Sequence, residues 1–200
     1  MICVNLYGGP GVGKSTMAAD IFSALKCDGI KAELVGEFAK ELSYDMAYNV
    51  MADQHYLFAI QAHRLWRLEQ AGVEVAVCDS PLLLNLAYDR QPNNGYFIQY
   101  VISTYKQYQN LDFVLKRDER YWDMDQRKGN IQDDIQMDHK IDAILLDVLR
   151  GEYPKIKIDP NEEVDFSFVL DEIQSHVKMA RFRTDAAPKR QYQDEPWRAL

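Results

Sequence analysis

The sequence predicts a three-layer α/β/α fold in which helices cover both faces of a five-stranded parallel sheet. Apolar, strand-like runs alternate with amphipathic helical stretches along the chain, the pattern of parallel strands joined by crossover helices. The run Val73–Cys78 is apolar except for one acidic residue, as expected of a strand buried on both faces. The 200 residues show no repeat or flexible linker, so they suit one domain.

The first half of the chain is predicted to supply three strands and two long helices. The strands are Ile2–Tyr7, Lys31–Val35 and Val73–Cys78, and the helices are Lys14–Lys26 and Asp53–Gln70. Apolar residues recur at helical spacing in both helices, and a glycine follows each of them.

The second half continues the alternation and contains a predicted lid. A short apolar helix follows Asp79-Ser80-Pro81. The remaining elements are expected at Tyr96–Tyr108 (helix), Leu111–Lys116 (strand), Ile135–Leu149 (helix), Lys155–Ile158 (strand) and Val164–Val177 (helix). The stretch Arg117–Asn130 is densely charged with few apolar anchors, which indicates a loop or short lid.

The charge distribution separates a body from a tail. The net charge of −8 argues against a protein that binds nucleic acid over its whole surface. Residues 176–200 hold six basic and three acidic residues, a net charge of +3 that leaves −11 for the rest. We therefore expect a domain over residues 1–177 and a basic tail over 178–200. The tail is either a solvated end or an arm that contacts DNA or another partner.

Zinc-type sites and membrane-spanning segments are not indicated. No apolar run approaches the roughly eighteen residues of a membrane span, and no basic stretch precedes the first strand. The three cysteines have no zinc-type spacing, and Cys3 and Cys78 read as small core residues in a reducing compartment. None of the scattered histidines (His55, His63, His139 and His176) is assigned to catalysis.

A glycine loop between the first strand and first helix predicts a nucleotide site. It fits the pattern G-x-x-x-x-G-K-[ST] at every fixed position, and it consists of Gly8, Gly9, Pro10, Gly11, Val12, Gly13, Lys14 and Ser15, with Thr16 following. Backbone N–H groups of such a loop cradle phosphate oxygens, and the positive end of the next helix adds to the attraction. Lys14 is expected to reach the terminal phosphates of ATP, and Ser15 to bind Mg²⁺.

A second acidic group for the metal is predicted at the end of the third strand. Asp79 directly follows this apolar run, where it can bind Mg²⁺ or substrate, and Ser80 can assist through its hydroxyl. The alternative is that Asp79 caps the helix near Pro81.

Residues after the second strand are candidates for the acceptor site, because ligands of such sheets bind beyond the carboxyl ends of the strands. Glu37 can orient an acceptor hydroxyl or take its proton, or it can cap the next helix. Phe38, Tyr44 and Tyr48 can stack on a base, although aromatic residues at these spacings are more often core.

The predicted lid supplies positive charge for a transferring phosphoryl group. Arg117, Arg120 and Arg127 are the candidates, with Lys128 beside them. Neighbouring acidic residues nearly balance this charge, so a plain solvated loop is the alternative.

These features together resemble the small P-loop nucleoside and nucleotide kinases, over roughly residues 1–175. The nicotinamide-riboside-kinase-like branch is nearest, since its members carry Glu-Tyr-Ala-Arg-Glu where this chain has Glu37-Phe38-Ala39-Lys40-Glu41. The chain is also similar in size and layout to phage kinases that phosphorylate 5-hydroxymethyluracil in DNA. The resemblance implies a sheet order of 2-3-1-4-5.

Two departures from that branch concern the acceptor. Phe38 and Lys40 replace its Tyr and Arg, and residues 120–129 lack its Asp-Asp-Gly lid pattern, which makes nicotinamide riboside a poorer candidate. The implied function is transfer of the γ-phosphoryl group of Mg-ATP to a hydroxyl, with 5-hydroxymethyluracil in phage DNA as the specific candidate.

Three alternatives remain open. The acceptor can be a free nucleoside or nucleoside monophosphate. The protein can instead be a switch that hydrolyses ATP and moves a partner, or a nucleotide-binding module without catalysis. A cytoplasmic location is expected, in the host cytoplasm for a phage protein, with no membrane partner.

Overall fold

The computed structural model describes residues 1–90, 94–117, 131–149, 156–158 and 166–186. Five parallel strands form one sheet in the order β2-β3-β1-β4-β5. They are β1 (Ile2–Tyr7), β2 (Ala32–Val35), β3 (Val75–Cys78), β4 (Gln109–Leu115) and β5 (Ile156–Ile158). This order confirms the predicted five-stranded parallel sheet and the order that the resemblance implied.

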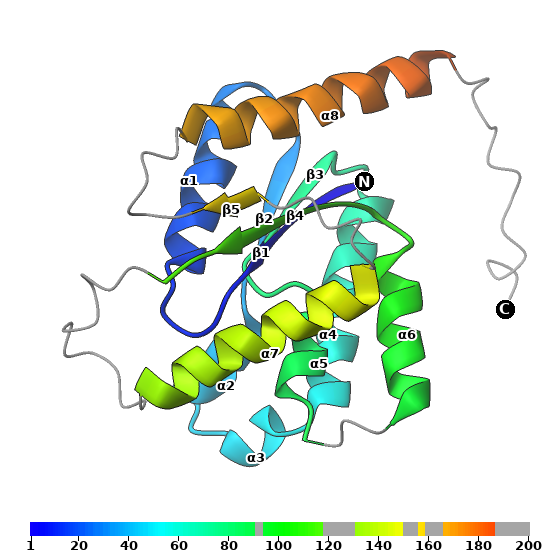
Figure 1. The fold of residues 1–200 in the computed structure, drawn as a ribbon. Helices are drawn as coiled ribbons and strands as arrows, with labels where there is room; N and C mark the ends of the chain where they lie inside the picture. The colour runs from blue at the N-terminus through cyan, green and yellow to red at the C-terminus, as the bar shows by residue number, and fades with distance from the viewer. Residues whose placement is uncertain (91–93, 118–130, 150–155, 159–165, 187–200) are drawn as a thin grey trace, which may run out of the picture.

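Helices cover both faces of the sheet (Figure 1). One face carries α1 (Lys14–Cys27) and α8 (Phe166–Ala186). The other face carries α4 (Gln54–Gln70), α5 (Leu84–Tyr88), α6 (Gly95–Tyr105) and α7 (Ile131–Leu149). Two short helices, α2 (Phe38–Tyr44) and α3 (Tyr48–Met51), follow β2. The predicted three-layer arrangement is therefore confirmed.

The alternation of side chains along β1 separates two hydrophobic cores. Ile2, Val4 and Leu6 pack with α1 and α8, whereas Cys3 and Tyr7 pack with the helices of the other face. Successive side chains of a strand point to opposite faces, so an apolar strand between two helical layers feeds both cores.

Element bounds differ from the predictions mainly at helix ends. The last helix runs from Phe166 to Ala186 instead of ending at Val177, so it crosses the predicted domain boundary at residue 177. The domain division therefore stays a prediction. The helices α2 and α3 had no predicted counterparts; α3 is a single turn with no buried residue, so no apolar periodicity marks it.

Two predictions fall largely or wholly outside the described residues. The lid candidate includes residues 118–130, among them Arg120, Arg127 and Lys128, and the tail includes residues 187–200. Within the described ranges, no helix is long and apolar enough to cross a membrane.

Candidate active site

The glycine loop lies at the carboxyl end of β1, the central strand of the sheet. Gly11 and Gly13 have φ angles of 78° and 94°, which side chains other than glycine rarely adopt, so the loop's path depends on these two residues. Gly13 is the N-cap of α1, and the first turn of that helix contains no acidic side chain. The positive helix end is therefore free to attract an anion.

Lys14 folds back over the loop. Its Nζ donates to the carbonyl oxygens of Gly8 and Gly9, at 2.8 Å each. An ammonium group has three N–H donors, so one remains for a phosphate oxygen. Burial lowers the pKa of Lys14, while the negative charges of Glu37 and Asp79 oppose this effect. The lysine is thus a partly buried cation held in place by its own loop.

Asp79 meets the glycine loop through Ser15. The Ser15 hydroxyl donates to Asp79 Oδ2 at 2.7 Å. The other carboxylate oxygen, Oδ1, is buried and has no hydrogen-bond partner in the described structure. Asp79 does not cap the nearby helix, because α5 begins at Leu84 and its N-cap is Leu83. The sequence alternative of a helix cap is therefore wrong for Asp79.

This pair fits a magnesium ion held mainly by a nucleotide. Mg²⁺ is commonly bound through one or two protein oxygens, with phosphates and water completing its shell. Ser15 Oγ and Asp79 Oδ1, which has no hydrogen-bond partner in the described structure, are oxygen ligands of that kind. Among the residues described, no group of three or more His, Cys, Asp or Glu side chains is placed to hold a metal alone. The two oxygens are of the kind and number that Mg²⁺ takes from a protein when phosphates and water complete its shell.

Glu37 stands at the N-cap position of α2, but its side chain makes no capping hydrogen bond in the described structure. Burial raises the pKa of Glu37; the positive charge of Lys14 opposes this, and the negative charge of Asp79 adds to it. The carboxylate therefore lies within electrostatic reach of both Lys14 and Asp79. The structure brings these three predicted residues together at one edge of the sheet.

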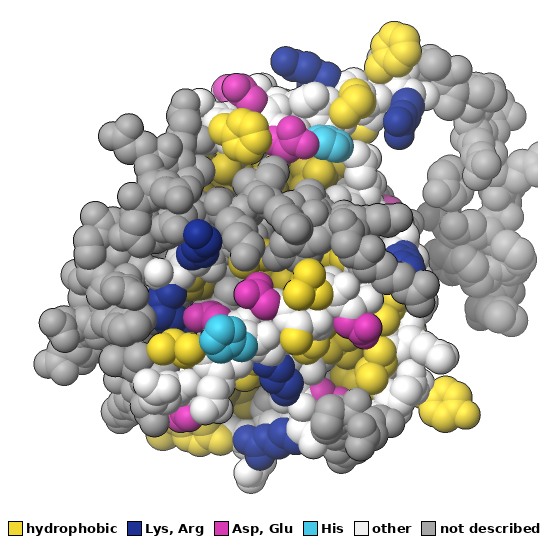
Figure 2. Space-filling model, in the orientation of Figure 1, with side chains coloured by type: hydrophobic (Ala, Val, Ile, Leu, Met, Phe, Trp, Pro, Cys, Tyr) yellow, Lys and Arg dark blue, Asp and Glu magenta, His cyan; other side chains and the backbone are white. Residues whose placement is uncertain are grey.

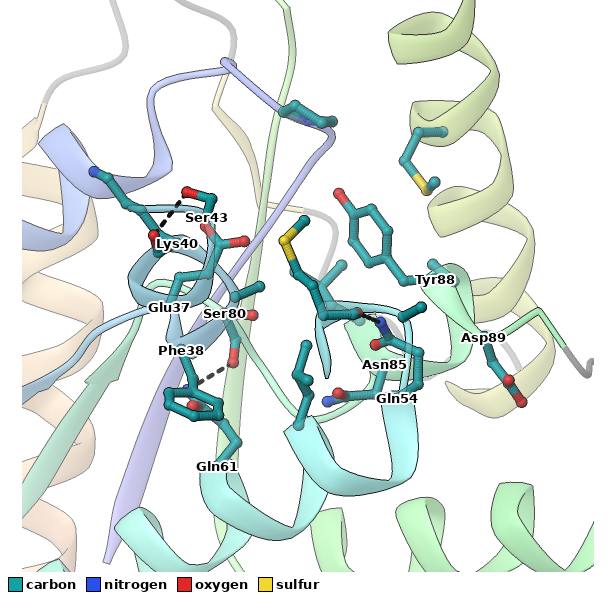
Figure 3. Close-up of a pocket in the computed structure, with 18 of the residues that line it drawn as sticks. Glu37, Phe38, Lys40, Ser43, Gln54, Gln61, Ser80, Asn85, Tyr88 and Asp89 are labelled. Carbon is teal, nitrogen blue, oxygen red and sulfur yellow. Dashed lines mark hydrogen bonds between the residues drawn. The ribbon is translucent and has the colours of Figure 1, made fainter. Parts of the chain in front are cut away.

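A pocket of about 970 Å³ opens beside Glu37. Pro10 of the glycine loop lines it at one end, and α2, α3, α4, α5 and α7 contribute the other walls. Figure 3 shows the Glu37 carboxylate and the Tyr88 hydroxyl pointing into this pocket. Burial and the nearby charge of Glu37 raise the pKa of Tyr88, so this hydroxyl stays protonated. The volume lies within the range of small-molecule sites.

The aromatic candidates separate into two groups. Phe38 is half-buried, lines the pocket, packs edge-on against Tyr56 at 5.7 Å and lies 5.2 Å from the Arg64 guanidinium. Tyr44 and Tyr48 are 75% and 63% exposed, so the preference for core positions was wrong for both. Tyr48 lines the pocket.

Gln61 is a pocket residue that the sequence analysis did not single out. It is 3% exposed on α4, and its Nε2 donates to the carbonyl oxygens of Ser80 (3.0 Å) and Gly36 (3.4 Å). Its Oε1 is buried without a partner among the described residues. A polar residue on the buried side of an amphipathic helix is the signal that marks it.

Arg117 lies against the glycine loop. Its Nη1 donates to Pro10 O at 2.8 Å, and its Nε donates to Asp138 Oδ2 of α7 at 2.9 Å. Arg117 is one of three predicted lid arginines, and the other two lie outside the described residues. Asp138 was not predicted, although acidic residues at positions 134 and 138 share one face of α7.

The comparisons with known proteins concern the family and the fold of the chain. A family model described as an AAA domain matches residues 3–163, which is most of the chain. The chain belongs to this AAA-domain family. No curated protein is a recognisable sequence relative of this AAA-domain chain.

Solved structures show that the AAA-domain chain has a nucleotide-kinase-like fold. It is similar to thymidylate kinase from Ehrlichia chaffeensis, with a TM-score of 0.57 and 14% identity over 88% of this chain and 98% of that one. It is also similar to deoxyadenosine kinase from M. mycoides, solved with dCMP and a flexible dCDP, with a TM-score of 0.50 and 16% identity over 90% and 100% of the two chains.

Proposed function

We propose that the protein is an ATP-dependent kinase that transfers the γ-phosphoryl group of Mg-ATP to a hydroxyl of a nucleoside- or nucleotide-type acceptor. The observation that carries this proposal is that the glycine loop and the large pocket adjoin, since Pro10 of the loop lines the pocket together with Glu37. An acceptor in the pocket therefore lies next to the terminal phosphate of a nucleotide on the loop. Transfer between two bound molecules needs this proximity.

The loop residues stabilise charge on the transferring group. Lys14 has one N–H donor left for a phosphate oxygen and is already fixed by Gly8 and Gly9, so little reorganisation is needed during reaction. The amides of the loop and the start of α1 surround the remaining phosphate oxygens. Ser15 and Asp79 would hold Mg²⁺, which supplies further neutralisation of phosphate charge when bound.

Glu37 is the proposed proton acceptor. Its raised pKa makes the carboxylate a stronger base than an exposed glutamate, and it lies at the loop side of the pocket. It orients the acceptor hydroxyl and takes its proton as the oxygen attacks the γ-phosphorus, while the bond from that phosphorus to the β–γ bridging oxygen breaks and ADP leaves. The predicted lid arginines Arg120 and Arg127, which lie outside the described residues, belong to this proposal as sources of positive charge.

The acceptor class is supported by the structural relatives. One phosphorylates a nucleotide and the other a nucleoside, as their names state, and the second holds dCMP and dCDP. Their identity to this chain is low, so the support concerns a nucleoside or nucleotide as a class. Within this class, 5-hydroxymethyluracil in phage DNA remains the specific candidate from the sequence resemblance.

The face of the molecule shown in Figure 2 gives DNA binding little support. Acidic and basic side chains alternate over the face shown in Figure 2, without one broad basic area among its coloured atoms. The net charge of −8 also opposes binding to a polyanion. A DNA acceptor requires a salt-sensitive affinity, with a log–log slope of about −0.9 for each phosphate contacted on duplex DNA.

Transfer of labelled phosphate tests the proposal. The protein is incubated with γ-labelled ATP, Mg²⁺ and, in turn, nucleosides, nucleoside monophosphates, plain DNA and DNA containing 5-hydroxymethyluracil. Label on a nucleoside or nucleotide supports a kinase of small acceptors, and label on the modified DNA alone selects the specific candidate. Label on none of them, with no release of phosphate, contradicts the proposal.

An ATP-hydrolysing switch is the second candidate, because the AAA-domain match is compatible with an ATPase. Release of inorganic phosphate without a labelled acceptor favours it. The large pocket beside Glu37 favours the kinase, since a hydrolase needs only water at that position.

A further inference from the structure

Arg117 and two carboxylates of α7 form a cluster against the glycine loop, here called the loop clamp (Arg117, Asp134 and Asp138). Arg117 Nε donates to Asp138 Oδ2 at 2.9 Å, and Nη1 lies 3.7 Å from Asp134 Oδ2. The Arg117 side chain is only 11% exposed. The segment just after β4 and the helix α7 thus meet on the glycine loop.

Both partners of this ion pair also bond the loop backbone. Asp138 Oδ1 accepts from the Gly9 N–H at 2.5 Å, and Arg117 Nη1 donates to the Pro10 carbonyl at 2.8 Å. The pair therefore spans the second and third residues of the loop. It holds the loop from the side of α7, while Lys14 holds it from within.

The fit around Gly9 is tight. A Cβ placed on Gly9 would collide with Asp138 Oδ1 and lie 2.9 Å from Arg117 Nη2. Gly9 is not among the residues with positive φ, so its backbone alone does not require glycine. A side chain at Gly9 would instead have to displace the Asp138 and Arg117 side chains of the clamp.

The clamp also sets the charge beside the nucleotide site. Two carboxylates next to a loop that binds a triphosphate repel the ligand unless a cation neutralises them. Arg117 is close to both, and its Nη2 is buried over Gly9 without a partner among the described residues. The charges of Asp138 and Arg117 both influence Lys14, which places the clamp within electrostatic reach of that ammonium group.

We propose that Arg117 is a positioning residue that neutralises Asp134 and Asp138 and, together with Asp138, fixes the start of the glycine loop for nucleotide binding. This inference rests on the nucleotide-binding part of the proposed function. On this inference Arg117 contributes to the affinity for ATP, and α7 stabilises the glycine loop by direct contact. A lid arginine that contacts the transferring phosphoryl group would act on turnover instead.

A double-mutant cycle tests the proposal, with the affinity for Mg-ATP measured by titration calorimetry. Arg117→Ala leaves two carboxylates uncompensated at the loop, and we expect about tenfold weaker binding. Adding Asp138→Asn to Arg117→Ala removes one of those charges while keeping an acceptor for the Gly9 N–H, and it should recover most of the loss. Contacting residues commonly show coupling of this size.

A matched control separates local from overall charge. Asp147→Asn removes one negative charge from the same helix, at a position about 13 Å along the helix axis from Asp138. Combined with Arg117→Ala, it should recover no affinity. Thermal unfolding of each variant identifies any that fail to fold, and Arg117→Lys, which keeps the charge, should bind Mg-ATP better than Arg117→Ala.

The outcomes distinguish this inference from the proposed function. Equal affinity in Arg117→Ala and the Arg117→Ala/Asp138→Asn variant overturns the clamp. So does a fall in kcat by about 10³-fold or more with unchanged affinity, which is the behaviour of an arginine on the transferring group. If the variants show the expected coupling but the wild-type protein phosphorylates no acceptor, the clamp is supported and the proposed kinase function is contradicted.

Discussion

Glu37 combines burial with a nearby cation, and the two have opposite effects on its proton affinity. Burial dominates, so the pKa of its carboxyl is raised above the usual value. A proton acceptor must be ionised to act, and turnover should therefore rise with pH through this raised pKa. The acidic limb of the rate profile should lie above the value of about 4.3 for an exposed glutamate.

Substitution of Glu37 tests its role as a base. Glu37→Gln keeps the shape and removes the base, so we expect kcat to fall by about 10²–10⁴-fold. The affinity for ATP should change only a few-fold. Glu33→Gln, on β2 but away from the carboxyl edge, is the matched control and should keep both values. Steady-state kinetics that show normal turnover in Glu37→Gln would remove this residue from the mechanism.

Asp112 is a buried carboxylate inside the sheet that depends on its donors. It accepts from Asn5 Nδ2 at 2.8 Å and from the Tyr105 hydroxyl at 2.5 Å, and burial raises its pKa. Tyr105→Phe should lower the free energy of unfolding by ~1–3 kcal/mol, because the carboxylate loses one donor. Tyr108→Phe, which removes a hydroxyl that does not reach Asp112, should cost less. Urea unfolding of both variants makes the comparison.

At the scale of single residues, the sequence predicts the part of the site that the chain builds locally. Gly8 to Ser15 are consecutive, and the spacing alone carries their chemistry. The hydrogen bond between Ser15 and Asp79 can be expected as well, because the strands before these residues end at the same edge of the sheet. The contact of Asp138 with Gly9 joins residues 129 positions apart through one side chain, and no local pattern encodes it.

Among the elements, α8 is held to the sheet by apolar contacts and by one ion pair at its exposed side. Val169, Ile173 and Val177 are fully or almost fully buried. Arg181 donates to Glu74, just before β3, from Nε at 2.6 Å and from Nη2 at 2.9 Å. The helix therefore continues beyond Val177 along the protein surface.

This ion pair predicts a pH dependence of stability. The hydrogen bond from Arg181 is the main cause that lowers the pKa of Glu74 to about 2. The stabilisation should thus be complete above the ordinary glutamate pKa of about 4.3 and lost as the pH falls from there to about 2. The effect should be small, because Arg181 is half-exposed.

Thermal unfolding between pH 7 and pH 2 checks this dependence. The difference in melting temperature between the wild type and Glu74→Gln should shrink as the pH falls, and added salt should reduce it at neutral pH. Asp171→Asn, an exposed position on α8, should show no such trend. A constant difference down to pH 2 would contradict the assignment.

Elements with strong apolar patterns were predicted well, and those without were not. The strand β1 has the predicted bounds, and α4 begins one residue after Asp53, whose side chain caps it by accepting from the Tyr56 N–H. The extension of α8 to Ala186 escaped prediction because it buries little apolar surface; Phe182 is 77% exposed. Periodicity identifies burial, and a helix that leaves the core gives no such signal.

For the whole molecule, ligand binding should appear as stability. A ligand that binds only the folded protein adds ~2.7 kcal/mol at a concentration of 100 times its Kd. For a chain of this size, each kcal/mol corresponds to about 2–4 °C, so saturating Mg-ATP should raise the melting temperature by about 5–10 °C. Differential scanning fluorimetry measures this shift.

Lys14→Ala is the matched variant for that measurement. Its melting temperature without ligand should stay near that of the wild type, because the side chain bonds only loop carbonyls. With Mg-ATP the shift should largely disappear, and phosphoryl transfer should fall by at least about 10²-fold. An undiminished shift in Lys14→Ala would mean that the nucleotide binds elsewhere.

The central position of β1 has a consequence for how such a protein can diversify. The strand lies between β3 and β4, so the floor of the nucleotide cradle is fixed from both sides. The proposed acceptor pocket is lined in large part by the short helices α2, α3 and α5, which connect strands without belonging to the sheet. On the proposed function, replacing these short helices would alter which acceptor binds, while the loop that binds the nucleotide would stay the same.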